Sequence, residues 1–137
     1  MPPNCNFQII SFGGEFEWLN DVSVVLKYNE KNQKLAMDYI DKIHEKNMGG
    51  TEILEPLQSA FKLKTKNKNE KKRYFLLTDG AVVNEEEVIK LIDKNCGGKN
   101  DDDRLFTFGV GYGASKSLVM DSAKKGRGQY FFVDEND

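Results

Sequence analysis

Hydroxyl and carboxylate side chains stand beside glycines at two places where binding chemistry is feasible. Thr78-Asp79-Gly80 sets a hydroxyl and a carboxylate next to a glycine, and Gly49-Gly50-Thr51 sets a hydroxyl after two glycines. Hard divalent cations such as Mg²⁺ take oxygen ligands of this kind and keep several waters. The pattern therefore favours a cation site, although taken singly Asp79 can cap a turn and Thr51 can cap a helix.

The sequence lacks the residues that several other kinds of chemistry require. Cys5 and Cys96 are the only cysteines and His44 is the only histidine, so a four-ligand Cys/His zinc cage and a disulfide framework are both excluded. No Gly-x-Ser-x-Gly nucleophile turn and no Walker A loop occur in the sequence. We therefore expect a protein that is not an enzyme.

The elements that position these residues follow from the hydrophobic pattern. Short apolar runs predict strands, and apolar residues at helical spacing predict helices between them. Such alternation is typical of a doubly wound, mostly parallel α/β sheet with helices on both faces. The strands are expected at 7–12, 73–78, 104–109 and 129–133, and the helices at 35–43, 55–61, 84–96 and 115–125.

Helix boundaries have their own signals. Pro56 has no N–H donor and belongs in a first turn, Asn84 and Ser115 are expected N-caps, and Gly126 follows two lysines at a C-terminus.

In a parallel sheet the functional loops follow the carboxyl ends of the strands. Three of the predicted strands end in glycine-containing loops, and the loop with Gly50 and Thr51 is expected to reach the same edge. We call this edge the rim. Its expected members are Gly13, Gly14, Gly50, Thr51, Asp79, Gly80 and Gly111.

Four segments in this order resemble a von Willebrand factor A domain over nearly the whole chain. They are Phe-Gln-Ile-Ile-Ser-Phe-Gly from residue 7, Met-Gly-Gly-Thr-Glu-Ile-Leu from 48, Phe-Leu-Leu-Thr-Asp-Gly from 75 and Phe-Thr-Phe-Gly-Val-Gly from 106. Gly-Gly-Thr-Glu-Ile and the closing Gly-Arg-Gly-Gln-Tyr-Phe are most similar to the subgroup of inter-alpha-trypsin inhibitor heavy chains. The resemblance implies one domain over residues 1–137.

The resemblance also implies a metal-dependent adhesion site at the rim, with Thr51 and Asp79 as ligands of Mg²⁺ or Mn²⁺. The Asp-x-Ser-x-Ser loop on which that site is founded, with its strand and helix, is missing from this sequence. Two ligands are too few to hold magnesium well, so metal binding by this chain alone is not expected. The missing strand would lie between residues 7–12 and 73–78, which leaves open edges for direct pairing, for a strand-donating chain or for self-association.

The function implied by the resemblance is recognition of a protein ligand at the rim. In intact members of the family, this recognition uses a divalent cation bound there. A nucleotide-binding domain is the alternative, because Gly109-Val-Gly111-Tyr-Gly-Ala114 fits Gly-x-Gly-x-x-Ala and Asp134 follows about 20 residues later. A third alternative is a structural subunit whose rim binds nothing.

Charge and composition limit the classes of partner that we expect for this chain. The stretch 62–73 holds seven basic residues, but no aromatic residue lies among them before Tyr74, so we expect a solvated loop and no nucleic acid. No apolar run has the roughly 20 residues needed to cross a bilayer, and no signal segment precedes residue 7, so we expect no membrane partner. Two cysteines are too few for a disulfide framework, which favours a reducing, cytoplasmic compartment.

Overall fold

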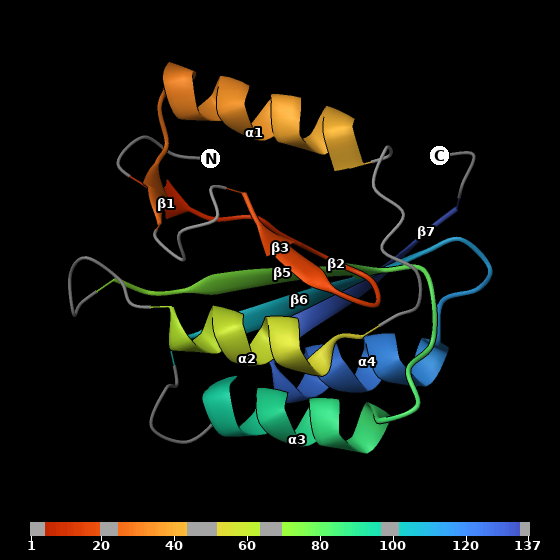
Figure 1. Cartoon of the computed structure of the whole chain (residues 1–137). Coiled ribbons are helices and arrows are strands. Elements are labelled where there is room, and N and C mark those ends of the chain that lie inside the picture. Colours follow the sequence, from red (N-terminus) through yellow and green to blue (C-terminus); the bar gives the residue numbers. More distant parts are fainter. Residues whose placement is uncertain (1–4, 20–24, 44–51, 64–69, 97–101, 135–137) are drawn as a thin grey trace. The chain divides into compact units, whose positions relative to one another are not determined.

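The structure is a computed structural model (Figure 1). It describes residues 5–19, 25–43, 52–63, 70–96 and 102–134. The chain forms two compact units, Met1–Lys68 and Asn69–Asp137, which are called here the N-terminal and C-terminal units and are considered separately. Among the described residues, no helix is both long enough and apolar enough to cross a membrane.

Four short strands of the N-terminal unit pair as two antiparallel ribbons. Strand β1 (Asn6–Phe7) pairs with β4 (Leu26–Lys27), and β2 (Ile10–Phe12) pairs with β3 (Phe16–Trp18). The single buried strand predicted at 7–12 is therefore wrong. Its residues are divided between two ribbons and are only partly buried.

The physical reason is visible in the residues after Phe12. Gly13 and Gly14 allow a tight turn, and Phe16 and Trp18 then alternate with Glu17, which is the period of a half-buried strand. Phe16 lies opposite Phe12 in the ladder. The predicted elements do not include a strand at 16–18, and the short apolar-polar alternation there was the missed signal.

Two helices complete this unit. Helix α1 (Glu30–Ile43) hydrogen-bonds to the β2–β3 ribbon, since the Tyr39 hydroxyl lies 2.5 Å from the Ser11 hydroxyl. Helix α2 (Leu54–Lys62) contains Pro56 in its first turn, as predicted from the missing N–H donor. Helix α2 contacts β2.

The C-terminal unit is a parallel sheet with two helices. Strands β5 (Arg73–Thr78), β6 (Arg104–Val110) and β7 (Arg127–Val133) lie in the order β5-β6-β7. Helix α3 (Glu85–Cys96) connects the first two strands, and α4 (Lys116–Lys125) connects the last two. These elements match the predicted ones to within two residues.

Both helices of this unit lie against one face of its sheet (Figure 1). Leu76, Leu105 and Thr107 point to that face and are buried, with the Thr107 hydroxyl donating to the Val119 carbonyl oxygen at 2.6 Å. The opposite face carries stacked aromatic rings. We call it the aromatic face, and its members are Phe75, Leu77, Phe106, Phe108 and Phe131.

The two ends of α4 test the capping residues that were predicted from the sequence. The Ser115 hydroxyl accepts a hydrogen bond from the Leu118 N–H at 3.2 Å, which confirms the predicted N-cap. Gly126 follows the helix as predicted, but its φ of −79° does not need a glycine. A Cβ at Gly126 would lie 2.6 Å from Leu105 Cβ, so close packing requires it, while Arg127 adopts the left-handed conformation with φ of 60°.

Candidate binding rim

The loop after β5 carries the acidic member of the rim. Thr78 is buried at the strand end, and its hydroxyl lies 3.4 Å from the Gly80 N–H, which donates to it. Asp79 follows, and its carboxylate is exposed. The loop therefore holds one carboxylate in solvent on a backbone that is tied to the end of the sheet.

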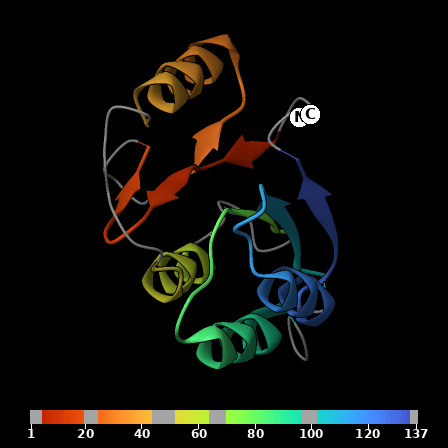
Figure 2. The same ribbon diagram turned by 90° about the vertical axis from the view of Figure 1, so that its right-hand side faces the viewer.

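The loop after β6 lies directly against the loop after β5. Gly111 begins it with φ of 76°, and its N–H donates to the Val133 carbonyl oxygen at 2.9 Å. The Ser115 N–H donates to the Gly80 carbonyl oxygen at 3.3 Å. The loops after β5 and β6, which carry the predicted rim residues Asp79, Gly80 and Gly111, therefore lie side by side at one end of the sheet. Figure 2 shows the path of these two loops.

Gly113 is a rim residue that the sequence analysis did not single out. A Cβ on this residue would lie 2.9 Å from the backbone carbonyl oxygen of Asp79, which is closer than real Cβ atoms come. Only a glycine lets the two loops approach this closely without a shift of backbone. Its place in the glycine-rich run 109–113 was the available signal, but nothing in the sequence says which glycine meets Asp79.

Further polar groups surround these loops. The Ser115 hydroxyl lies 3.5 Å from a Glu85 carboxylate oxygen, and the Tyr112 hydroxyl donates to Asp134 at 3.4 Å. Tyr112 is 88% exposed. An exposed aromatic ring beside acidic side chains suits contact with another polypeptide.

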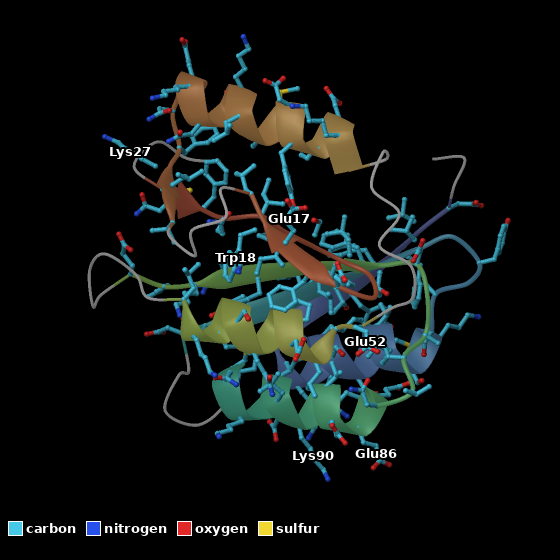
Figure 3. All side chains as sticks on the ribbon, viewed as in Figure 1. Glu17, Trp18, Lys27, Glu52, Glu86 and Lys90 are labelled. Carbon is cyan, nitrogen blue, oxygen red and sulfur yellow. The ribbon has the colours of Figure 1, made fainter. Side chains whose placement is uncertain are left out.

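The N-terminal unit contains the other predicted rim residues. Gly13 is buried and Gly14 is exposed in the turn between β2 and β3. The Glu52 N–H donates to the Gly13 carbonyl oxygen at 2.7 Å, so this turn meets the start of the segment leading into α2 (Figure 3). Gly50, Thr51 and His44 lie outside the described residues, as does the part of the basic stretch 62–73 that covers residues 64–69.

The described residues do not fit a complete divalent-cation site. They include no group of three or more His, Cys, Asp or Glu side chains placed to hold a metal ion. Asp79 alone supplies a carboxylate at the end of β5. Mg²⁺ needs near-octahedral oxygen coordination, and one carboxylate fixes little of it.

The nucleotide-binding alternative loses its physical basis at Gly109. A Cβ there would lie 2.9 Å from the Phe132 ring and 3.1 Å from Val119, so this glycine permits packing between sheet and helix inside the unit. The N-terminus of α4 is already capped by Ser115. Packing within the unit and a serine cap therefore account for these residues without a nucleotide.

Neither cysteine is part of a disulfide, and the buried Cys96 does not have the environment of a nucleophile. Cys96 is buried, and burial raises the pKa of its thiol from 9.0 to about 11, with the Asp103 carboxylate adding to the shift. Burial also raises the pKa of the Tyr74 phenol, again with Asp103 contributing. A thiol that stays protonated at neutral pH is inert.

Similarity to known proteins extends over nearly the whole chain. No family model matches it. A von Willebrand factor A domain-containing protein of Dictyostelium discoideum is 32% identical over 133 residues, which are 97% of this chain and 13% of that protein. The chain therefore spans a small part of this relative's length.

Solved structures share the fold at low sequence identity. A von Willebrand factor type A protein from Catenulispora acidiphila has a TM-score of 0.79 at 14% identity, over 97% of this chain and 30% of that one. Proximal thread matrix protein 1 from the mussel byssus, solved with a zinc-occupied MIDAS motif, has a TM-score of 0.66 at 22% identity over 93% of this chain and 30% of its own. The comparisons give no support to the nucleotide-binding alternative. The chain has the α/β fold of a von Willebrand factor A domain.

Proposed function

We propose that this chain is a protein-interaction module that binds a protein ligand at the rim. The observation that carries the proposal is the direct contact between the loops after β5 and β6, which sets the exposed Asp79 carboxylate among glycine backbone groups. Loops held at the end of a sheet are common positions for binding residues, and an exposed carboxylate gives a charged anchor. Similarity to von Willebrand factor A domain proteins supports the same function.

We further propose that both units belong to one domain over residues 1–137, similar to the inter-alpha-trypsin inhibitor heavy chain subgroup. The sequence similarity extends over 97% of the chain and so includes both units. In this interpretation the strand and helix bearing the Asp-x-Ser-x-Ser loop are the family features absent from the sequence.

We propose Thr51 and Asp79 as the two oxygen ligands that this chain contributes toward Mg²⁺ or Mn²⁺. A cation bound there would attract a carboxylate of the protein ligand. Because two ligands leave most of the coordination to other groups, cation-dependent recognition requires additional oxygen ligands from outside these residues. No catalytic step is assigned to the chain.

A peptide library displayed on phage tests the proposed function with a defined probe. Peptides are selected on the wild-type chain and then measured against Asp79→Ala. We expect the selected peptides to bind wild type and to lose about tenfold or more in affinity for the variant, as is common when a charged interface anchor is removed. The same measurements in EDTA show whether a cation contributes.

Asp93→Ala is the matched control. Asp93 is also an exposed carboxylate, but it lies on α3 and not on the rim. Peptides that bind wild type, Asp79→Ala and Asp93→Ala equally would contradict the proposal. Circular dichroism of each variant confirms that the loss at Asp79 is a loss of recognition and not of folding.

A further inference from the structure

The segments after β5, β6 and β7 each bring one polar or charged side chain to the same end of the sheet in the C-terminal unit. In order across the sheet they are Asp79, Tyr112 and Asp134, and all three are exposed. The Gly111 N–H donates to the Val133 carbonyl oxygen, so the loop with Tyr112 begins beside the end of β7. This end of the sheet therefore carries a phenol in the loop between two carboxylates.

The backbone on both sides of Tyr112 is held in place. Gly111 has a φ of 76°, and Gly113 lies against the Asp79 carbonyl oxygen. The Tyr112 ring itself is 88% exposed. A tyrosine has only two side-chain torsions, so a ring presented on a fixed backbone loses little conformational freedom when it is covered by a partner.

The Asp134 carboxylate is positioned at this ring. The Tyr112 hydroxyl donates to Asp134 Oδ2 at 3.4 Å. A carboxylate has about four acceptor positions on its two oxygens, and the phenol uses one of them. The pair therefore offers a hydrogen-bond acceptor with negative charge next to the face of an electron-rich ring.

An arginine side chain matches such a pair in shape and in charge. Its planar guanidinium stacks on the face of an aromatic ring and donates two parallel hydrogen bonds to a carboxylate. The ammonium of a lysine is a point charge and lacks this planar geometry. A carboxylate of the ligand would be repelled by Asp134.

The pair lies away from the outer edge of β5. The strand that the sequence lacks relative to the family is expected beside β5, whereas Tyr112 and Asp134 follow β6 and β7. The exposure of the pair therefore does not depend on whether another strand covers that edge.

We propose that Tyr112 and Asp134 recognise an arginine side chain of the protein ligand. The inference rests on the proposed function of the rim and names the chemistry of the partner, which is a polypeptide segment with an accessible arginine. Tyr112 supplies the ring on which the guanidinium stacks, and Asp134 accepts its N–H groups. Asp79 in the adjoining loop adds a second negative charge that favours a cationic ligand.

Parallel peptide selections give the first test. Random peptides displayed on phage are selected in EDTA on the wild-type chain and on Asp134→Asn. Arginine should be enriched among the peptides selected on wild type relative to the unselected library, and the enrichment should be lost on Asp134→Asn. Peptides selected on wild type without enrichment of arginine would overturn the proposal.

A double-mutant cycle gives the second test. The arginine peptide that binds most tightly is synthesised together with a version in which glutamine replaces the arginine. Tyr112→Ala and Asp134→Asn should each weaken binding of the arginine peptide about tenfold or more. Tyr112→Phe keeps the ring and loses only the hydrogen bond to Asp134, so a loss of about two- to tenfold is expected.

The glutamine peptide and Asp93→Asn are the matched controls. Tyr112→Ala and Asp134→Asn should bind the glutamine peptide about as wild type does, because the interaction that they remove is already absent. Asp93 is an exposed carboxylate on α3, away from the rim, so Asp93→Asn should stay within about twofold of wild type for both peptides. Equal losses for the arginine and glutamine peptides in folded Tyr112→Ala and Asp134→Asn would overturn the proposal.

Asp79→Ala separates this inference from the proposed function. If Asp79→Ala weakens peptide binding whereas Tyr112→Ala and Asp134→Asn do not, the rim binds a ligand and the arginine proposal is wrong. If all three variants bind as wild type does, the proposed function fails as well. A loss confined to Tyr112→Ala and Asp134→Asn would support the arginine site and contradict the role assigned to Asp79.

Discussion

Gly113 and Asp79 are in such close contact that a single added carbon on Gly113 would lie 2.9 Å from the Asp79 carbonyl oxygen. The atom it would meet belongs to the backbone and cannot rotate away. The contact joins the loop that carries the carboxylate to the loop that carries the glycines. It therefore fixes the geometry on which the proposed recognition depends.

Gly113→Ala is expected to destabilise the chain by about 1–3 kcal/mol, the usual cost of overpacking a close contact. Relief of the clash requires the loops after β5 and β6 to separate, so peptides selected on the rim should also bind more weakly. Urea unfolding measures the first effect and peptide titration the second. Unchanged stability and unchanged binding would show that the two loops are not held together.

Ser122→Ala is expected to stabilise the chain by about 1 kcal/mol. The Ser122 hydroxyl is buried in α4, and no described group hydrogen-bonds to its oxygen. A buried polar group without a partner has lost its water without compensation, and alanine is the better helix former. Urea unfolding decides the sign, and Ser117→Ala, on the exposed side of the same helix, is the control.

Stability is expected to fall as pH rises from 9 toward 11, in part through Cys96. Burial raises the pKa of this thiol from 9.0 to about 11, so the folded state keeps a proton that the unfolded state loses. The stabilisation is complete below pH 9 and is lost as pH passes the folded value. Unfolding measured against pH should show a shallower decline in Cys96→Ala; equal slopes would contradict the assignment.

Thiol labelling gives a second check on Cys96. Cys5 is only partly buried, whereas Cys96 is inaccessible. A thiol reagent at neutral pH should therefore modify Cys5 first and Cys96 only at the rate of unfolding. Rapid modification of both cysteines in the folded chain would show that the Cys96 environment opens readily.

Magnesium titration of the chain alone is expected to give no saturable heat below millimolar concentration. The described residues offer one rim carboxylate, which is too few ligands for tight binding of this cation. Calorimetry with wild type and Asp79→Ala makes the measurement. Saturable binding that disappears in Asp79→Ala would show that the chain builds a cation site by itself.

The sequence predicted the C-terminal unit well because each of its elements has a strong local signal. Strand β5 is built on the apolar run 74–77, and α4 has a serine cap at one end and a glycine after the other. Elements of this kind are determined mainly by nearby residues. The fold class followed from their alternation.

The N-terminal unit was predicted less well because its strands have only two or three residues. A run such as Phe7–Phe12 has one apolar pattern, yet it is divided between two pairing partners. Which partner each half takes depends on residues 16–18 and 26–27, and local periodicity carries no information about that choice.

The roles of individual glycines at the candidate site could likewise not be predicted from the sequence. Gly109 and Gly113 belong to one glycine-rich run, but one permits packing against Phe132 and the other permits contact with Asp79. Their sequence spacing also fits a nucleotide-binding motif. Only the three-dimensional neighbours distinguish the three roles, because a glycine has no side chain of its own to indicate a function.

The most direct test of the proposed rim is to map where a selected peptide binds. Amide chemical shifts of the ¹⁵N-labelled chain are recorded with and without the peptide. The proposal predicts that the largest changes occur at Asp79, Gly80, Gly111 and Gly113 and that they are lost in Asp79→Ala. Largest changes on the outer side of α3, or at Phe75 and Phe131 on the aromatic face, would contradict it.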